Sequence, residues 1–170
     1  MKKQELFNRG RGLLEPEMMP FYEVAELNNG DAMMFQGELT TDFFIIKSGK
    51  LEVIEGTGSK AVTLDTLEAN DVFGEIAFFD EGERSATVRS SGKSVLYRMT
   101  RENFSDMTKT EPQLAMEYLV ILGKLVSGKL RRVDKMIAGV TGGQKVEKDH
   151  DLKKLVKDIR KAMKSKRDTF

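Results

Sequence analysis

The chain has 170 residues, of which 39% are hydrophobic, and its 28 Lys and Arg against 27 Asp and Glu give a net charge of +1. This length suits one domain, or one domain with an appended element, and the absence of cysteine excludes a disulfide framework and thiolate metal sites. No apolar run approaches the ~20 residues that span a bilayer, and no apolar signal region follows the first residues, so we expect a cytoplasmic protein.

Residues 1–20 contain glycines and prolines that interrupt any long helix, and they predict a cap of helical and turn segments. Between residues 21 and 99, short apolar or alternating runs are separated by turns that contain glycine or asparagine. Strands are predicted at 21–27, 32–35, 43–47, 51–54, 61–67, 85–90 and 94–99. Many short strands at this spacing indicate a β-sandwich or barrel. The predicted fold class is mainly β with flanking helices.

Residues 73–88 interrupt these strands with a predicted single helical turn, and they are the most informative segment of the chain. Arg84 offers a rigid fork of N–H donors that suits phosphate. Glu75 only accepts hydrogen bonds when ionised and so suits a ribose hydroxyl. Gly74 allows a ligand to come close to the backbone, because glycine has no Cβ and tolerates positive φ. Together with free backbone amides, these groups could hold a cyclic phosphodiester.

This segment resembles the phosphate-binding cassette of the cyclic nucleotide-binding domain family, of the catabolite-activator and protein kinase regulatory subunit types. The resemblance covers about residues 21–138 and implies a β-roll followed by a long helix. It implies ribose contacts for the glycine and glutamate, and phosphate contacts for the arginine and for amides of nearby small residues. Glu83 departs from the proline that many members have before the arginine, although catabolite-activator members also have glutamate there. The expected ligand-binding residues are Gly74, Glu75, Ile76, Ala77, Arg84, Ser85 and Ala86.

The resemblance favours cAMP as the ligand over cGMP, because Ser85 stands where cGMP-selective cassettes commonly have threonine. The threonine and serine with which catabolite-activator members contact adenine correspond to Lys129 and Leu130, so that contact is missing in its usual form. The candidate base contacts are therefore Ser127, Lys129 and Arg131 on the predicted long helix. No cofactor is expected besides the nucleotide ligand.

The long helix is predicted over residues 111–138, because a threonine, an acidic residue and a proline at residues 110–112 resemble a helix start, and Gly139 follows its end. A helix that is apolar on two sides needs two partners. One is its own β-domain, and the other, by resemblance to the dimerising helix of the family, is the same helix of a second subunit in a homodimer. One apolar stripe contains Leu114, Tyr118, Ile121 and Leu125, and the second contains Leu119, Leu122, Val126, Leu130, Val133 and Ile137.

Residues 139–170 predict a glycine-rich link and a basic amphipathic tail helix. Within them, residues 144–170 hold ten Lys or Arg against five Asp or Glu, which leaves the rest of the chain with 18 against 22. Such a helix can pack on its own domain or dimer, bind a protein partner, lie on an anionic membrane or contact nucleic acid. The roughly 30 residues after Gly139 have room for one helix, whereas a winged helix-turn-helix needs several, so sequence-specific DNA binding is not expected.

Catalysis is not expected either. His150 is the sole histidine, so a metalloenzyme on a small β-barrel would lack its imidazole ligands, and no metal site is predicted. No Gly-x-Ser-x-Gly elbow supports a serine hydrolase. The sequence predicts a cyclic nucleotide sensor whose long helix moves or reorders when ligand binds. The alternative is a ligand-independent adaptor that retains the fold with a degenerate cassette and binds a protein partner.

Overall fold

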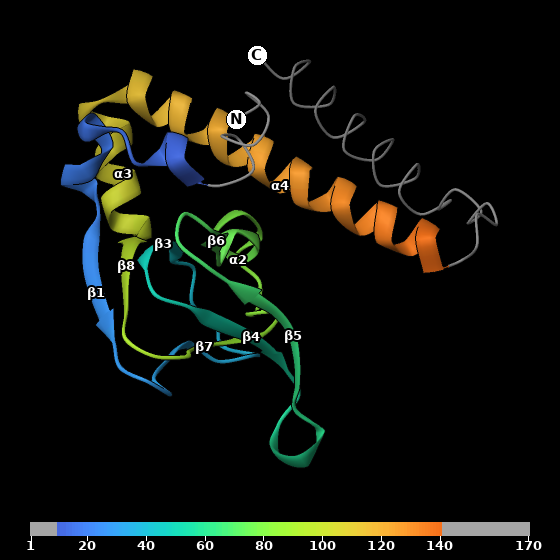
Figure 1. Cartoon of the computed structure of the whole chain (residues 1–170). Helices are drawn as coiled ribbons and strands as arrows, with labels where there is room; N and C mark the ends of the chain where they lie inside the picture. Colours follow the sequence, from blue (N-terminus) through green and yellow to red (C-terminus); the bar gives the residue numbers. More distant parts are fainter. Residues whose placement is uncertain (1–9, 141–170) are drawn as a thin grey trace. The chain divides into compact units, whose positions relative to one another are not determined.

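A computed structural model describes residues 10–140 of the chain. The chain divides into two compact units, residues 1–128 and residues 129–170, and each is described by itself. The first unit contains the β-domain with its flanking helices (Figure 1). The predicted tail helix lies outside the described residues, as does the first part of the predicted N-terminal cap.

The strands occupy the predicted places. Their bounds are β1 (Glu23–Leu27), β2 (Ala32–Met34), β3 (Phe43–Ser48), β4 (Leu51–Glu55), β5 (Val62–Leu67), β6 (Val72–Phe73), β7 (Thr87–Ser90) and β8 (Ser94–Met99). The two-residue strand β6 was not predicted, because it is too short to show alternation. Two 3₁₀ helices, η1 (Gly10–Leu13) and η2 (Pro16–Phe21), precede β1, and a third, η3 (Gly58–Lys60), lies between β4 and β5.

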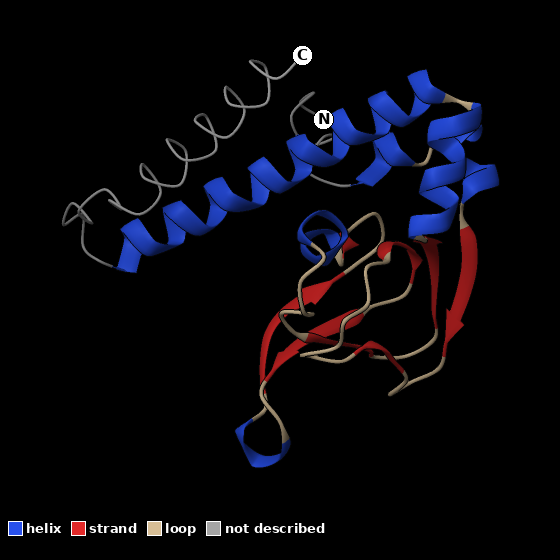
Figure 2. Ribbon diagram, turned by 180° about the vertical axis from the view of Figure 1, so that it is seen from behind, coloured by secondary structure: helices blue, strands red, loops and turns tan. Residues whose placement is uncertain are grey.

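The strands form two antiparallel sheets, with the orders β1-β8-β3-β6 and β2-β7-β4-β5. One apolar cluster draws residues from both sheets, so the sheets pack face to face. A second cluster covers the other face of the sheet β1-β8-β3-β6. Its side chains include residues of η1, of η2 and of the two helices that begin at residues 101 and 112. Figure 2 shows these helices gathered on one side of the strands. The mainly β fold class with flanking helices is therefore confirmed.

Strand β3 supplies both clusters, because successive side chains of a strand point to opposite faces. Phe44 and Ile46 face the second sheet, whereas Phe43 and Ile45 face the helices. All four side chains are at most 1% exposed. This double burial explains why the strand is an unbroken apolar run rather than an alternating one.

Among the described residues, the α-helices are α2 (Glu75–Asp80) within the cassette, between β6 and β7, and α3 (Arg101–Thr110) and α4 (Pro112–Val140) after the last strand. Helix α3 was not predicted. Its start nevertheless has a recognisable signal, because the Thr100 hydroxyl accepts a hydrogen bond from the Asn103 amide at 3.0 Å and so caps the helix. Helix α4 continues through Gly139, two residues beyond its predicted end.

Replacing Thr100 with alanine is expected to lower the free energy of unfolding by about 1 kcal/mol, because one amide of the first turn of α3 loses its partner. Urea denaturation monitored by circular dichroism would measure the change. Thr108→Ala is the control, since Thr108 lies exposed within the same helix and caps nothing. An equal or larger loss in the control would contradict the capping role.

The two stripes predicted on α4 need one correction. Leu122 was assigned to the second stripe, but it is 0% exposed and belongs to the core cluster with Ala115, Tyr118 and Leu125. Leu122 lies one turn after Tyr118, so both side chains face the same side of the helix. Between residues 112 and 135 of α4, where side chains are described, the large apolar residues that stay exposed are Met116, Leu119, Val120, Leu130 and Val133. Ile137 of the predicted second stripe lies outside this range.

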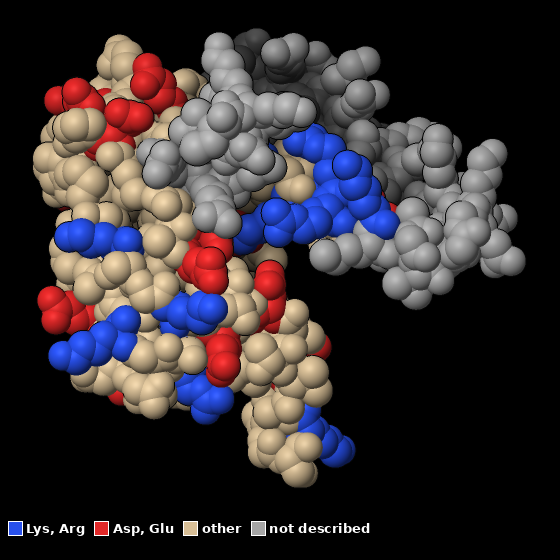
Figure 3. Space-filling model, in the orientation of Figure 1, with Lys and Arg blue, Asp and Glu red and all other residues tan. Residues whose placement is uncertain are grey.

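Basic side chains gather on the second half of α4, where Figure 3 shows a blue surface. Between residues 124 and 135 the helix carries Lys124, Lys129, Arg131, Arg132 and Lys135, against Asp134. All of these residues are exposed.

Candidate functional site

Gly74 caps α2 and shapes the site. Its φ of 80° lies in the left-handed region that favours glycine. A Cβ at this position would lie 2.7 Å from Nη1 of Arg84, 2.7 Å from the backbone oxygen of Asp42 and 3.3 Å from the Phe44 ring. Both the backbone conformation and the lack of space therefore require glycine here.

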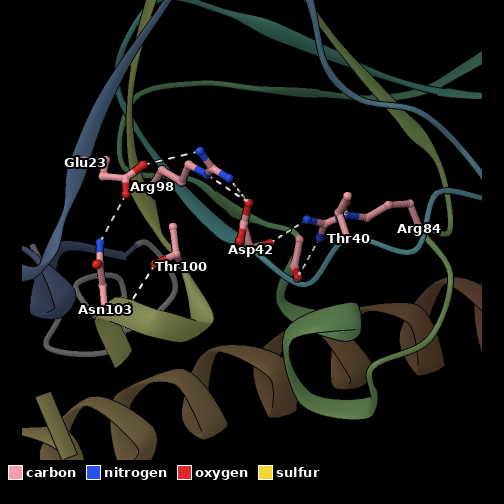
Figure 4. Close-up of polar contacts among 8 residues, drawn as sticks. Glu23, Thr40, Asp42, Arg84, Arg98, Thr100 and Asn103 are labelled. Atoms are coloured by element: carbon pink, nitrogen blue, oxygen red, sulfur yellow. Dashed lines mark hydrogen bonds and ion pairs between the residues drawn. The ribbon is translucent and has the colours of Figure 1, made fainter. Parts of the chain in front are cut away.

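Arg84 is buried beside Gly74, with 3% of its surface exposed. Its guanidinium donates three hydrogen bonds. Figure 4 shows Arg84 together with the polar residues around it. Nε donates to the Thr40 hydroxyl at 2.8 Å, Nη2 to the backbone oxygen of Asp42 at 2.7 Å, and Nη1 to the backbone oxygen of Gly74 at 3.1 Å. The loop between β2 and β3 and the start of the cassette thus hold the same side chain.

None of these three acceptors carries a charge. Among the described residues, no carboxylate forms an ion pair with Arg84, because the nearby carboxylate of Asp42 accepts from Nε and Nη2 of Arg98 at 2.8 and 2.5 Å. Burial lowers the pKa of Arg84, although nearby carboxylates, Asp42 first, act in the opposite direction. An arginine remains protonated in a protein, so the site holds a buried positive charge that no anion pairs directly.

Glu75, the first residue of α2, is also buried, with 6% of its surface exposed. Its negative charge lies at the end of the helix where the backbone dipole favours it, and it is close enough to Arg84 to oppose the lowering of that residue's pKa. The structure thus brings together Gly74, Glu75 and Arg84, the three residues for which the sequence predicted contacts with ribose and phosphate.

The other predicted cassette residues differ in exposure. Ala77 and Ala86 are buried, whereas Ser85 is exposed and Ile76 is 52% exposed. Of the two aromatic residues of α2, Phe78 is buried in the core, whereas Phe79 is 47% exposed.

The predicted base contacts lie on α4. The Ser127 side chain is exposed, and no hydrogen bond joins it to the described cassette residues. Lys129 and Arg131 are exposed residues of the second unit and are described apart from the cassette. The base contacts of all three therefore stay a prediction.

A polar network continues from Asp42 to the helices (Figure 4). Arg98 of β8 pairs with Asp42 and also with Glu23 of β1, at 3.3 Å. The second carboxylate oxygen of Glu23 accepts from the Asn103 side chain of α3 at 3.5 Å. The sequence analysis assigned no site role to Thr40, Asp42 or Arg98. The only signal in the sequence was that Thr40 and Asp42 are polar residues directly before the buried strand β3.

Aromatic side chains also link the cassette to α3 and α4. The Phe78 ring of α2 lies 5.4 Å from Phe104 of α3 and 6.0 Å from Phe43, centroid to centroid. Both of these rings contact Tyr118 of α4, at 5.7 and 6.1 Å. A shift of α2 would therefore disturb the packing of both helices, because interiors are close-packed.

Among residues 10–140, no group of three or more histidine, cysteine or acidic residues has the arrangement of a metal site. Within that range, no helix combines the length and the apolar character that crossing a membrane would require.

The sequence profile of the cyclic nucleotide-binding domain matches residues 24–111, which is more than half of the chain. The protein belongs to the cyclic nucleotide-binding domain family. The match includes every predicted cassette residue and ends at the start of α4. The family assignment predicted from residues 73–88 is thereby confirmed.

Curated relatives of this cyclic nucleotide-binding domain include a receptor protein and a protein kinase subunit. The chain is 28% identical to the cyclic AMP receptor protein of Thermus thermophilus, across 79% of this chain and 61% of that protein. It is 32% identical to a cAMP-dependent protein kinase regulatory subunit of Mycosarcoma maydis, across 51% of this chain and 17% of that protein. The chain thus spans less than two thirds of these curated relatives.

Solved structures support the fold. The crystal structure of the Thermus thermophilus catabolite activator protein has a TM-score of 0.62 and 26% identity, and the match covers 75% of this chain and 61% of that chain. A cyclic nucleotide-binding domain from Methylobacillus flagellatus has a TM-score of 0.66 at 20% identity, across 75% of this chain and 72% of that chain. At that identity, the second likeness shows the fold alone.

Proposed function

We propose that this protein is a non-enzymatic sensor that binds cAMP in the cassette around Arg84. The observation that carries the proposal is the buried guanidinium, whose protein acceptors are all neutral. A guanidinium has five N–H donors, so three protein contacts leave one N–H on each terminal nitrogen for a ligand. The single negative charge of a cyclic phosphodiester would neutralise the guanidinium and accept those donors.

The remaining parts of the ligand follow from this anchor. Glu75 would accept a hydrogen bond from the 2′-hydroxyl of the ribose, because an ionised carboxylate only accepts. The choice of cAMP over cGMP is supported by Ser85 and by the names of two relatives, a cyclic AMP receptor protein and a cAMP-dependent kinase subunit. Ser127, Lys129 and Arg131 remain the proposed candidates for base contacts.

Ligand binding would reach α4 through the cassette helix. Phe78 of α2 contacts Phe104, and Phe104 contacts Tyr118, so an altered position of α2 changes the surface on which α4 rests. A ligand shifts such an equilibrium only by binding one arrangement more tightly than the other. The output is proposed to be a homodimer through α4 or a protein partner bound in the cytoplasm by the tail, without sequence-specific DNA recognition.

Titration calorimetry with cAMP and with cGMP tests this function directly. A complementary measurement is the melting temperature, since a ligand at 100 times its Kd stabilises the folded state by about 2.7 kcal/mol. We expect saturable binding of cAMP and at most equal affinity for cGMP. If millimolar cAMP gave neither heat nor a thermal shift, the sensor function would be wrong.

A separate prediction concerns Glu75. The unaltered protein is expected to bind 2′-deoxy-cAMP about tenfold more weakly than cAMP, because a hydrogen bond to a charged group contributes ~1.5–3 kcal/mol. The Glu75→Ala variant should discriminate little between the two ligands, and Glu75→Gln should fall between, since an amide still accepts one hydrogen bond. Competition binding measures all six affinities, and the same discrimination in every protein would exclude the ribose contact.

The adaptor remains a second candidate because of one observation. The three hydrogen bonds of Arg84 join the β2–β3 loop to the cassette, so the same side chain could serve only to hold these segments together. An adaptor would bind its protein partner equally with and without cAMP, whereas a sensor would not.

A further inference from the structure

We propose that Thr40 is a positioning residue for Arg84, and that its hydroxyl sets which oxygen of a bound cyclic phosphate the guanidinium contacts. The inference rests on the proposed function. It concerns a residue of the β2–β3 loop, outside the cassette (Figure 4).

Thr40 makes the one side-chain contact among the three that hold the guanidinium. Its Oγ1 accepts from Nε at 2.8 Å, while the other two acceptors are backbone oxygens. The bonds from Nε and Nη2 both end in the β2–β3 loop, so they hold one edge of the planar group. Without the hydroxyl, a buried N–H of a charged group would lose its acceptor, and the side chain would have to turn to find another.

The loop keeps its place independently of this hydroxyl. The backbone amide of Arg84 donates to the backbone oxygen of Glu38 at 2.9 Å, and the backbone amide of Gly37 donates to the backbone oxygen of Arg84 at 2.9 Å. The backbone amide of Gln36 donates to the Thr87 hydroxyl at 3.0 Å. Thr40 itself is exposed, so an isosteric valine costs little packing. Removal of its hydroxyl should therefore leave the guanidinium with two of its three hydrogen bonds, so that it can turn, and leave the loop in place.

The ligand chemistry supplies a specific measurement. The two exocyclic oxygens of a cyclic phosphodiester are not equivalent, and replacing either one with sulfur gives two phosphorothioate diastereomers. Sulfur is the weaker hydrogen-bond acceptor, so a guanidinium held in one orientation binds the two diastereomers with different affinities. A guanidinium free to turn discriminates less. A merely structural defect would weaken both ligands alike and leave their ratio unchanged.

Thr41→Val is the matched control, because Thr41 is the next residue and its hydroxyl forms no hydrogen bond with any described residue. Thr40→Ser is the conservative variant that keeps the hydroxyl. Calorimetry would measure the affinity of the unaltered protein, Thr40→Val, Thr40→Ser and Thr41→Val for cAMP and for both phosphorothioate diastereomers. Melting temperatures would show whether each variant is folded.

We expect Thr40→Val to bind cAMP about tenfold more weakly, because a guanidinium that has turned would lose about one charged hydrogen bond to the phosphate. Its diastereomer ratio should be closer to one. Thr40→Ser and Thr41→Val should keep both the affinity and the ratio. Normal affinity with an unchanged ratio in Thr40→Val would overturn this inference while leaving the proposed function standing. Failure of the unaltered protein to bind cAMP would overturn both.

Discussion

Replacing Arg84 with alanine is expected to weaken cAMP binding by at least tenfold, with the β-domain still folded. The ligand would lose donors from a charged group, each worth ~1.5–3 kcal/mol, together with the charge that neutralises its phosphate. Fold retention is expected because the three orphaned acceptors are a hydroxyl and two carbonyls, which water can satisfy once the guanidinium is gone. Calorimetry would measure the affinity, and far-ultraviolet circular dichroism the fold.

Two further variants sharpen this experiment. Arg89→Ala removes the exposed side chain of an arginine of β7, and this side chain forms no hydrogen bond or ion pair with the described residues, so the affinity of this variant for cAMP should be unchanged. Arg84→Lys keeps the charge but lacks the planar fork that satisfies Thr40, Asp42 and Gly74 together, so its affinity should lie between those of Arg84→Ala and the unaltered protein. Equal affinity of all four proteins would remove Arg84 from the site and leave the adaptor as the better function.

The joint change Leu130→Glu and Val133→Glu is expected to turn the proposed homodimer into a monomer. Their side chains are 62% and 50% exposed. Gly123 lies in this helix with nothing within 4 Å of where a Cβ would be. A glycine inside a helix costs about 1 kcal/mol relative to alanine, but it allows a second helix to approach closely.

Each introduced carboxylate would be buried unpaired in such an interface, which costs several kcal/mol. Light scattering at high micromolar concentration measures the mass. Lys135→Glu is the control, because Lys135 lies about 140° from Leu130 and about 160° from Val133 around the axis of α4, at about 100° per residue. The control should remain dimeric. A monomeric unaltered protein would contradict the dimer and require another cover for this face, for which the amphipathic segment after residue 144 is the candidate.

Local sequence patterns were sufficient to predict most of the strands and the central residues of the candidate site. Seven strands could be predicted because alternation and turn residues act over a few neighbouring positions. Gly74, Glu75 and Arg84 could be selected because the cassette is contiguous, so its residues keep their order and spacing in the sequence. The family assignment followed from the same sixteen residues, and the match over residues 24–111 supports it.

Other features depend on contacts between distant segments. Leu119 and Leu122 are the same residue type three positions apart, yet one is 37% exposed and the other 0%, because the core lies against only one side of α4. Thr40 lies 44 residues before Arg84 and belongs to no motif. Asp42 pairs with Arg98 rather than with Arg84, its other arginine neighbour, so no ion pair among the described residues neutralises the charge of Arg84. Side-chain partners of this kind arise only when the sheets and loops pack, because hydrogen bonds and ion pairs act over a few ångströms in space, whatever the separation in sequence.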